Sequence, residues 1–286
     1  MTNRLQPLIG AICDDVTGAT DIASMFVRGG MQVVQYVGLP EAEQAVPNAD
    51  ALVIALKSRS IPANEAIAQS ITASRRLIDL GVRQIYFKYC STFDSTPEGN
   101  IGPVAEALRE ELGAAWVPHL PSLPVNGRTV YQGHLFVHDR LLSETGMAKH
   151  PLNPMNDSDL VRVLQAQTSG RVGKVTTSVV AQGAGLVTEV LNATDFSHVI
   201  GDAISEDDLE IWAETLRDAP LVAGGSGLAQ PLARAQLAAS PSRRISQQQI
   251  WPVGPALILA GSCSAMTLAQ VADYRARGGA CLQLDI

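Results

Sequence analysis

The sequence predicts an α/β fold: an N-terminal domain with a mostly parallel sheet and helices on both faces, plus the start of a second α/β domain. Two observations support this prediction. Short apolar runs alternate with segments whose apolar residues recur at helical spacing, an order typical of a parallel sheet covered by helices. A segment rich in breaker residues then interrupts the pattern near residue 240, and one more strand-like run follows it.

The predicted strands of the first domain follow one another along the chain. They are residues 8–13, 31–37, 51–56, 84–89, 129–137, 173–179, 197–203 and 221–225. Between the third and the fourth strand, residues 61–81 predict a helix with Ile67, Ile71, Leu77 and Leu80 on one stripe. Strand, helix and strand at this spacing indicate parallel neighbours.

The chain divides into three predicted segments. Residues 1–240 form the first domain, 241–255 a linker without apolar periodicity, and 256–286 the beginning of a second domain. The last segment predicts a strand at 256–261, a helix, and a strand at 280–286. One such unit cannot cover both faces of its own sheet, so we expect the protein to continue beyond Ile286.

The composition argues against several classes of function. The 286 residues are 46% hydrophobic with a net charge of -7, so we expect no nucleic-acid partner. No apolar run approaches the ~20 residues that span a bilayer, and no signal sequence opens the chain, so we expect a cytoplasmic protein without a membrane partner. The four cysteines lack CxxC spacing and are expected to be reduced thiols. A homodimer remains open.

The first predicted strand ends in an acidic segment, CDDVTGATD. Ligands of open α/β sheets bind at the carboxyl ends of strands, so polar residues there carry weight. Asp14 and Asp15 repel each other unless a cation, a proton or hydrogen-bond donors offset them, which is typical of a metal, a bound hydroxyl or a general base. Alternatively, Asp15 or Thr17 caps the following helix, although capping does not explain the pair together with Asp21.

Two further strand ends carry polar residues. After the third strand, Arg59 offers a fork that matches a carboxylate or a phosphate, although an ordinary loop charge is an equal alternative. After the fourth strand, a loop dense in hydroxyl groups leads into a helix and is suited to the oxygens of a polyhydroxy acid or a phosphate. Its candidate residues are Lys88, Ser91, Thr92, Asp94 and Ser95, and a helix cap by Ser95 or Thr96 is compatible with that role.

Two other features allow both a functional and a structural interpretation. His134 follows a glycine and either reaches the ligand or makes a structural hydrogen bond. A zinc site at His134, His138 and His150 lacks a fourth ligand and regular spacing. The turn at residues 224–227 could equally be a tight connection with Ser226 as helix cap, and we expect it to face the cleft.

Five motifs in order resemble the four-carbon acid sugar kinase family. They are DDVTGATD, KSR, KYCSTFDSTPEGNIGP, NGRTVYQGHLFVHDRLLSETGMAKHPLNPM and GSCSAMTLAQ. The CSTF and GSCS forms are most similar to the branch that acts on 3-oxo-tetronate. The resemblance implies ATP-dependent phosphorylation of the terminal hydroxyl of a four-carbon sugar acid, giving 3-oxo-tetronate 4-phosphate. It also implies an N-terminal domain that holds the sugar acid and a C-terminal domain that holds the nucleotide.

The resemblance also implies roles for individual residues. From the chemistry of phosphoryl transfer, we expect an aspartate of the Asp14 and Asp15 pair to accept the hydroxyl proton and Mg²⁺ to accompany ATP. Expected substrate contacts are Asp14, Thr17, Arg59, Lys88, Ser91, Thr92, Asp94, Ser95 and His134. Expected ATP contacts are Ser262 and Ser264.

Three alternatives stay open beside this hypothesis. A D-threonate or D-erythronate kinase belongs to the same family, and a non-catalytic sugar-acid-binding protein would need no ATP. The sequence contains no P-loop, and the glycine-rich segments that the family uses for ATP phosphates are absent from it, so we expect the 286-residue chain to bind the acid without turnover. A doubly wound dehydrogenase is disfavoured because no GxGxxG opens the first strand-to-helix turn.

Overall fold

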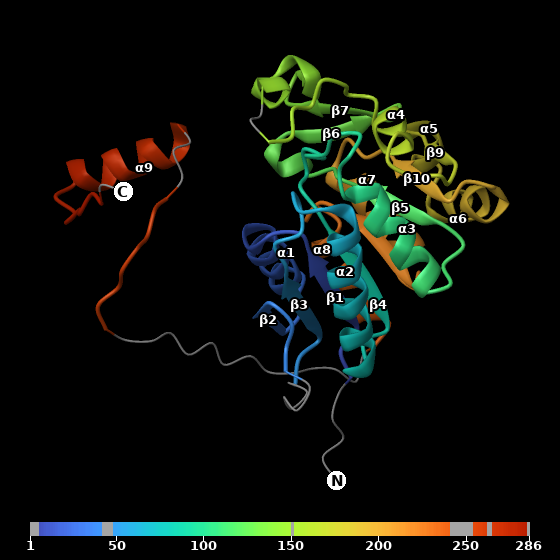
Figure 1. Ribbon diagram of the computed structural model, residues 1–286, viewed down its shortest axis with the longest axis horizontal. Coiled ribbons are helices and arrows are strands. Elements are labelled where there is room, and N and C mark those ends of the chain that lie inside the picture. The colour runs from blue at the N-terminus through green and yellow to red at the C-terminus, as the bar shows by residue number, and fades with distance from the viewer. Residues whose placement is uncertain (1–5, 42–47, 150–151, 241–253, 262–264, 285–286) are drawn as a thin grey trace, which may run out of the picture. The chain divides into compact units, whose positions relative to one another are not determined.

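The computed structural model describes residues 6–41, 48–149, 152–240, 254–261 and 265–284 (Figure 1). Two compact units are present, Met1–Ile245 and Ser246–Ile286. The first unit is built on an eight-stranded sheet with the order β2-β3-β1-β4-β11-β5-β10-β9, and its paired strands run parallel. A small antiparallel sheet, β6-β7-β8, accompanies it. The predicted α/β class with a mostly parallel sheet is confirmed.

The elements of the first unit alternate along the chain. The strands of the large sheet are β1 (Ile9–Cys13), β2 (Val33–Val37), β3 (Ala51–Ala55), β4 (Gln84–Lys88), β5 (Val117–Leu120), β9 (Val172–Val175), β10 (His198–Gly201) and β11 (Leu221–Gly224). Those of the small sheet are β6 (Arg128–Tyr131), β7 (His134–Val137) and β8 (Arg140–Leu141). The helices are α1 (Val16–Arg28), α2 (Ala63–Asp79), α3 (Ile101–Glu111), α4 (Leu160–Gln165), α5 (Thr177–Val180), α6 (Ala184–Ala193), α7 (Glu206–Leu216) and α8 (Ala229–Ala238).

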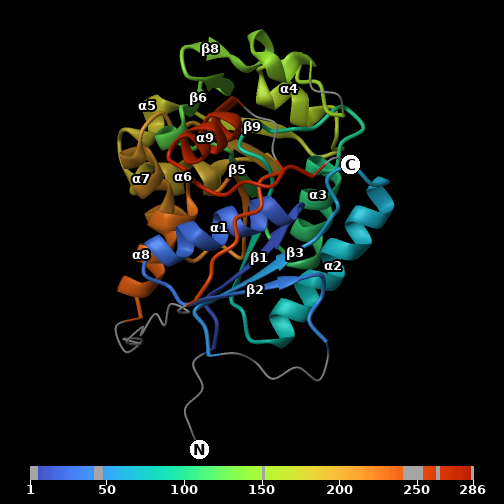
Figure 2. The ribbon, with the colours of Figure 1, turned by 90° about the vertical axis from the view of Figure 1, so that its left-hand side faces the viewer.

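Helices cover both faces of the large sheet, as the sequence predicts (Figure 2). One core lies between the sheet and α1, α5, α6, α7 and α8, with Phe26 and Trp212 fully buried in it. The other core lies between the sheet and α2, α3 and α4. The central strands β1, β3 and β4 are buried along their whole length. The continuous apolar sequences of β1 and β3 follow from this burial on both faces, while β4 is apolar between Gln84 and Lys88.

Three sequence predictions in this unit need correction. Strand β5, in the sequence WVPHL, was not predicted because its proline and histidine break the apolar pattern. The single strand expected at 129–137 is a hairpin of β6 and β7, since Gln132 and Gly133 adopt positive φ values of 52° and 77° and turn the chain. The strand expected at 173–179 ends at Val175, where α5 begins two residues later.

The hairpin is attached to the large sheet through a buried carboxylate. Asp202 follows β10, has no exposed surface, and accepts hydrogen bonds from the backbone N–H groups of Gln132 (2.7 Å), Gly133 (2.8 Å) and Thr177 (2.9 Å). These donors offset the cost of burying the carboxylate. Asp202 therefore fixes the hairpin and the start of α5 to the end of β10.

The described part of the second unit contains helix α9 (Ala265–Ala276). Residues 256–261 and 280–284 form no strand, so the predicted strands there are wrong for the described residues. A strand needs a neighbour for its backbone hydrogen bonds, and these runs pair with none of the described strands. Leu257, Ile258 and Leu259 are each 83% exposed.

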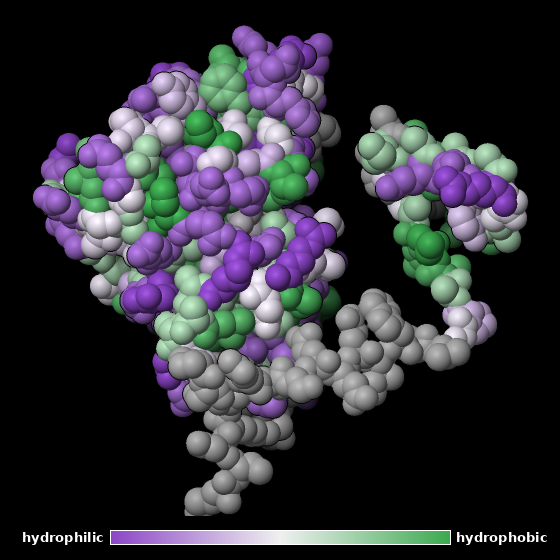
Figure 3. All heavy atoms as spheres, turned by 180° about the vertical axis from the view of Figure 1, so that it is seen from behind, coloured by the Kyte–Doolittle hydropathy of each residue, from purple (hydrophilic) through white to green (hydrophobic). Residues whose placement is uncertain are grey.

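On the face shown in Figure 3, hydrophilic residues are mixed with small groups of hydrophobic residues. None of the described helices is long and apolar enough to cross a membrane.

The order of the strands opens a crevice at the carboxyl end of the sheet. Strand β1 lies between β3 and β4, and the connection after it leads to α1 on one face. The connections after β3 and β4 lead to α2 and α3 on the other face. Loops that diverge in this way leave space between them, and this is where ligands bind in open α/β sheets. The polar strand ends found in the sequence meet at this place.

Candidate functional site

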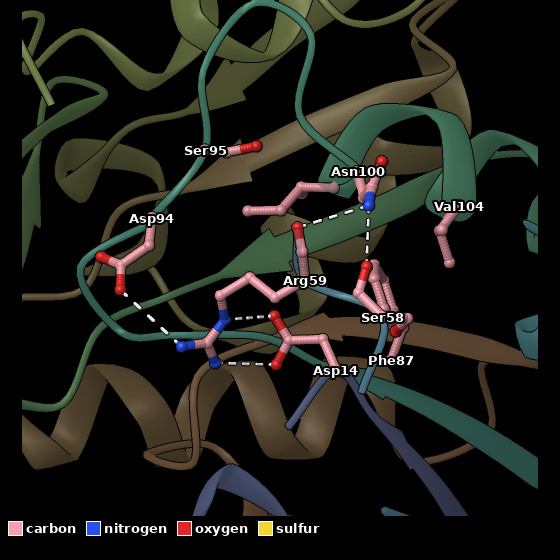
Figure 4. A pocket seen from close by; sticks show the side chains of 9 residues that line it. Asp14, Ser58, Arg59, Phe87, Asp94, Ser95, Asn100 and Val104 are labelled. Carbon is pink, nitrogen blue, oxygen red and sulfur yellow. Dashed lines mark hydrogen bonds and ion pairs between the residues drawn. The ribbon is translucent and has the colours of Figure 1, made fainter. Parts of the chain in front are cut away.

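A small pocket lies in the crevice between β1, β3 and β4 (Figure 4). Its wall is formed by Asp14, Ser58, Arg59, Phe87, Asp94, Ser95, Asn100, Ile101 and Val104. Three of the predicted strand ends contribute to it. Its free volume of about 10 Å³ is the room of roughly one water molecule. As the structure stands, the pocket therefore admits a single hydroxyl group and not a whole sugar acid.

Asp14 and Arg59 form a bidentate ion pair in the pocket wall. Arg59 donates from Nε to Asp14 Oδ2 and from Nη2 to Asp14 Oδ1, both at 2.8 Å. Asp14 is 5% exposed, and burial raises the pKa of its carboxyl above the ordinary value, against the lowering effect of Arg59. Burial alone would lower the pKa of Arg59, but the hydrogen bond and charge of Asp14 raise it. Both Asp14 oxygens are therefore engaged.

Two further carboxylates surround the same guanidinium. Asp15 Oδ2 lies 3.2 Å from Arg59 Nη2, and Asp94 Oδ2 lies 3.9 Å from Arg59 Nη1. Asp15 is also the N-cap of α1, where it accepts from the Gly18 N–H at 2.6 Å, so the capping alternative is confirmed for Asp15. Three carboxylates therefore surround one guanidinium, and they repel any further negative charge. A second anion beside Arg59 would meet that repulsion.

The loop after β4 holds Asp94 through a buried turn. Phe93 is fully buried with φ of 53°, a left-handed conformation that a bulky side chain adopts only under constraint. Its N–H donates to Cys90 O at 3.0 Å and closes the turn. Thr92 Oγ1 donates to Asp94 Oδ1 at 2.5 Å, which leaves Oδ2 toward Arg59. The turn thus orients one free carboxylate oxygen into the crevice.

Ser95 lies between the small pocket and a larger hollow. Its hydroxyl accepts from Gln167 Nε2 at 2.9 Å, and a Cβ on Gly99 would lie only 1.9 Å from that hydroxyl oxygen. The hollow has a volume of about 280 Å³. Its wall comprises Ser95, Thr96, Pro97, Pro154, Met155, Asn156, Asp157, Arg162, Val163 and Ala166. Ser95 therefore borders both spaces and is held by Gln167.

Asn100 also lines the pocket, although it is not among the residues predicted from the sequence. Its Nδ2 donates to the backbone oxygens of Ser58 (2.7 Å) and Ile61 (2.8 Å), which ties the start of α3 to the loop after β3. Its buried Oδ1 has no hydrogen-bond partner among the described residues. Asn100 is also the N-cap residue of α3, so the expected cap by Ser95 or Thr96 is wrong. No motif identifies this asparagine, because its partners lie about 40 positions away.

Lys88, Thr17 and Ser91 lie outside the pocket wall. Side chains alternate along a strand, so Lys88 points to the face opposite Phe87. Its buried Nζ donates to Tyr89 O at 2.8 Å and lies 3.8 Å from Asp21 Oδ2. Thr17 is exposed in the first turn of α1, and Ser91 is half-buried. Lys88 therefore pairs with α1, while Asp14, Arg59, Asp94 and Ser95 meet on the α3 side.

His134 is not among the residues that line the pocket. It lies on β7, where Nδ1 is 3.1 Å from Gln132 O and Nε2 is 4.0 Å from Asp159 Oδ2, contacts that match the structural interpretation. Ser262 and Ser264 lie outside the described residues, as does His150. Within the described ranges, no three His, Cys, Asp or Glu side chains are grouped to hold a metal ion.

The turn at residues 224–227 is buried rather than open to the crevice. A Cβ on Gly224 would lie 2.3 Å from Leu120 O, and one on Gly227 would lie 2.2 Å from Ser122 O, so both glycines allow close backbone packing. Ser226 is fully buried, and its hydroxyl has no partner among the described residues. Leu228 is the N-cap of α8, so Ser226 does not cap that helix.

Comparisons with known proteins address the whole chain. Residues 9–232 match the family described as "Sugar-binding N-terminal domain". The chain is 50% identical to the 3-oxo-tetronate kinase of Pseudomonas savastanoi pv. phaseolicola over 277 residues, which are 95% of this chain and 65% of that protein. It is 51% identical to the 3-oxo-tetronate kinase of Escherichia coli over 273 residues, covering 93% of this chain and 69% of the relative. The chain thus spans about two thirds of the length of these curated relatives.

Solved structures of the same architecture are also similar. A Haemophilus influenzae protein of family DUF1537 superposes with a TM-score of 0.82 at 46% identity, covering 93% of this chain and 65% of that one. A DUF1537 domain from Bordetella bronchiseptica, solved with bound citrate as a domain-swapped dimer, superposes with a TM-score of 0.68 at 30% identity. It covers 82% of this chain and 57% of its own.

Proposed function

Because this chain belongs to the four-carbon acid sugar kinase family, we propose that its first unit binds a four-carbon sugar acid for ATP-dependent phosphorylation of the terminal hydroxyl. The proposed product is 3-oxo-tetronate 4-phosphate, in line with the relatives named 3-oxo-tetronate kinase. A substrate with a carboxylate is also supported by the citrate bound to the Bordetella domain. D-threonate and D-erythronate are the alternative substrates.

The observation that carries the proposal is the gap between Arg59 Nη1 and Asp94 Oδ2. The two atoms form an ion pair at 3.9 Å, too far for a direct hydrogen bond, so an oxygen placed beside both would accept from Arg59 and donate to Asp94. A hydroxyl group needs one donor and one acceptor, which Arg59 and Asp94 supply. The room of about 10 Å³ beside them fits one such group.

We assign the proton acceptor to Asp94 in preference to Asp14 and Asp15. Both oxygens of Asp14 accept from Arg59, and Asp15 caps α1. Asp94 keeps Oδ2 toward the proposed hydroxyl. Phosphoryl transfer needs positioning and an acceptor for the hydroxyl proton more than covalent chemistry. The three carboxylates around Arg59 disfavour a substrate carboxylate beside it.

ATP would supply the phosphoryl group, and the expected contacts Ser262 and Ser264 stay predictions. Within the described residues, no three His, Cys, Asp or Glu side chains are grouped so that they could hold a magnesium ion. The first unit accordingly contributes substrate binding and proton acceptance to the proposed reaction. A homodimer is compatible with the domain-swapped Bordetella relative and stays a proposal as well.

Calorimetric titration of the chain with 3-oxo-tetronate, D-threonate and D-erythronate tests the proposal. We expect binding, with an affinity loss of about 10- to 100-fold for a 4-deoxy analogue that lacks the terminal hydroxyl, as for a hydrogen bond to a charged group. Asp94→Asn should remove that discrimination, while Asp139→Asn, an exposed aspartate outside the pocket wall, should keep it.

The outcomes separate the candidate functions. ADP release in the presence of the acid supports the kinase, and binding without ADP release even in a full-length protein supports the sugar-acid-binding alternative. Equal affinity for the acid and its 4-deoxy analogue would show that the Arg59 and Asp94 gap does not hold the hydroxyl. No binding of any four-carbon acid would overturn the proposal.

A further inference from the structure

Three buried side chains and the half-buried Glu106 form a continuous hydrogen-bonded chain beneath the loop that carries Asp94. Tyr89 Oη lies 3.0 Å from His119 Nδ1, and His119 Nε2 lies 3.0 Å from His198 Nδ1. His198 Nε2 lies 2.6 Å from Glu106 Oε2. Tyr89, His119 and His198 have no exposed surface. The chain runs from the end of β4, across β5 and β10, to helix α3.

The protonation state of this chain follows from its acidic end. Burial alone would raise the pKa of Glu106, but hydrogen bonds from Thr168, His198 and Arg109 lower it to about 2. Glu106 is therefore a carboxylate and can only accept, so His198 donates from Nε2. Burial lowers the pKa of both histidines, and Glu106 opposes this effect at His198, so both rings are neutral at pH 7.

A neutral imidazole has one donor and one acceptor, and this fixes the remaining bonds. Since His198 donates from Nε2, its Nδ1 accepts from His119 Nε2. His119 Nδ1 then accepts from the Tyr89 hydroxyl. Every hydrogen bond points toward Glu106, and each ring nitrogen in the chain has a partner. Such a fully satisfied buried network rigidifies the groups that it joins.

The network contacts the strained turn directly. The Phe93 ring packs edge-on against Tyr89 with centroids 5.2 Å apart and also lies against His119 at 6.5 Å. Phe93 precedes Asp94 and holds the left-handed conformation of the turn. Glu106, at the other end of the chain, lies on α3, the helix that follows this loop. The network therefore contacts the loop at Phe93 and ends on the helix that follows the loop.

We propose that Tyr89, His119, His198 and Glu106 form a positioning network that holds Phe93 in its left-handed conformation and thereby keeps Asp94 beside Arg59. None of the four lines the pocket, so the network acts through Asp94 and is not catalytic. Its effect on the loop is independent of the substrate. Its effect on ligand affinity rests on the proposed function.

The tautomers of the wild-type chain provide the first test. The network requires both histidines to be neutral with the proton on Nε2, a state that nitrogen chemical shifts of the imidazole rings distinguish from the Nδ1 form. A proton on Nδ1 of His119, or a charged ring at either position at neutral pH, would overturn the proposal. This measurement needs no variant and no ligand.

Hydrogen exchange of the Phe93 amide in Tyr89→Phe provides the second test. Its N–H closes the turn on Cys90 O, so its exchange rate reports opening of the turn. We expect exchange at least about tenfold faster in Tyr89→Phe. The control is Tyr86→Phe, which removes an equally buried hydroxyl and its 2.6 Å hydrogen bond to Gly225 O on the opposite face of β4. Equal exchange in the two variants would show a general loss of stability and overturn the proposal.

Affinity for the four-carbon acid gives the third readout, and we expect Tyr89→Phe to weaken it about tenfold while Tyr86→Phe leaves it within about twofold. A wild-type chain that binds no acid would overturn the proposed function, and the tautomer and exchange measurements would still decide the network. Unchanged affinity together with a faster-exchanging turn would overturn the claim that the loop positions Asp94 for ligand.

Discussion

Replacing Arg59 should destabilise the first unit more than replacing its partner Asp14. Arg59→Met leaves three carboxylates without their shared cation, and Asp14 is only 5% exposed. Removing one member of a buried ion pair costs about 3–5 kcal/mol in unfolding free energy. Asp14→Asn leaves Arg59 with Asp15 at 3.2 Å and Asp94 at 3.9 Å, so it should cost about 1–2 kcal/mol.

A surface pair of the same geometry serves as the control. Arg75 donates to Glu111 at 2.8 and 3.0 Å, but its side chain is 66% exposed. Arg75→Met should therefore leave the free energy of unfolding almost unchanged, because water screens an exposed pair. The comparison isolates burial as the cause of the larger effect at Arg59.

Urea unfolding followed by tryptophan fluorescence measures these free energies. Trp212 is fully buried in the first unit and reports its unfolding. A Trp251→Phe background removes the tryptophan that lies outside the described residues. The assay compares the denaturant midpoints of the variants at an unchanged slope.

The loss of unfolding free energy in Arg59→Met should depend on pH if the uncompensated carboxylates cause it. Burial already raises the pKa of Asp14, and loss of Arg59 raises it further. A carboxyl with a raised pKa in the folded state stabilises that state as the pH falls, because the folded form binds the proton more tightly. The cost of Arg59→Met should thus shrink between about pH 7.5 and about pH 5. A penalty equal to that of Asp14→Asn within about 0.5 kcal/mol, or one that is independent of pH, would refute this reasoning.

Two other predictions follow from the described contacts. Gly99→Ala should open the loop and weaken acid binding, since a Cβ there would lie 1.9 Å from Ser95 Oγ. Gly146→Ala is the control, because a Cβ at that position meets nothing within 4 Å. Equal thermal midpoints and equal acid affinities of the two variants would contradict this prediction. Glu106 has a pKa lowered to about 2, so its stabilising contribution is complete above the ordinary value of 4.5 and is lost as the pH falls toward 2. Acid unfolding of Glu106→Gln should lack that decline, and the same pH profile in both proteins would contradict it.

The sequence predicted the site residues best where polar side chains directly follow an apolar strand. Asp14, Arg59 and Asp94 are each predicted from a polar residue after an apolar run, and the structure brings all three into one cluster. The parallel sheet follows from the alternation of apolar runs and helical segments. These features depend on residues close together in the chain, so one sequence is sufficient to recognise them.

The features that the sequence did not reveal depend on distant partners. His119 and His198 are 79 residues apart, and neither has a pattern that marks it as buried and paired. Asn100 acts through backbone oxygens about 40 positions earlier. Strand β5 contains a proline and a histidine, and the burial of His119 is possible because Tyr89 and His198 are hydrogen-bond partners of its two ring nitrogens. Tertiary contacts therefore decide these elements, and local propensity does not.

The position of β11 has a consequence for how the protein is made. This strand is late in the chain, yet it lies between β4 and β5 and accepts the Tyr89 N–H at Gly224 O. During synthesis, the strand that carries the Asp94 loop lacks one of its two neighbours until residues 221–224 have left the ribosome. Such non-local pairing slows folding and exposes strand edges in the meantime. A nascent chain arrested before residue 221 should accordingly expose one edge of β4 and stay sensitive to protease at residues 89–96.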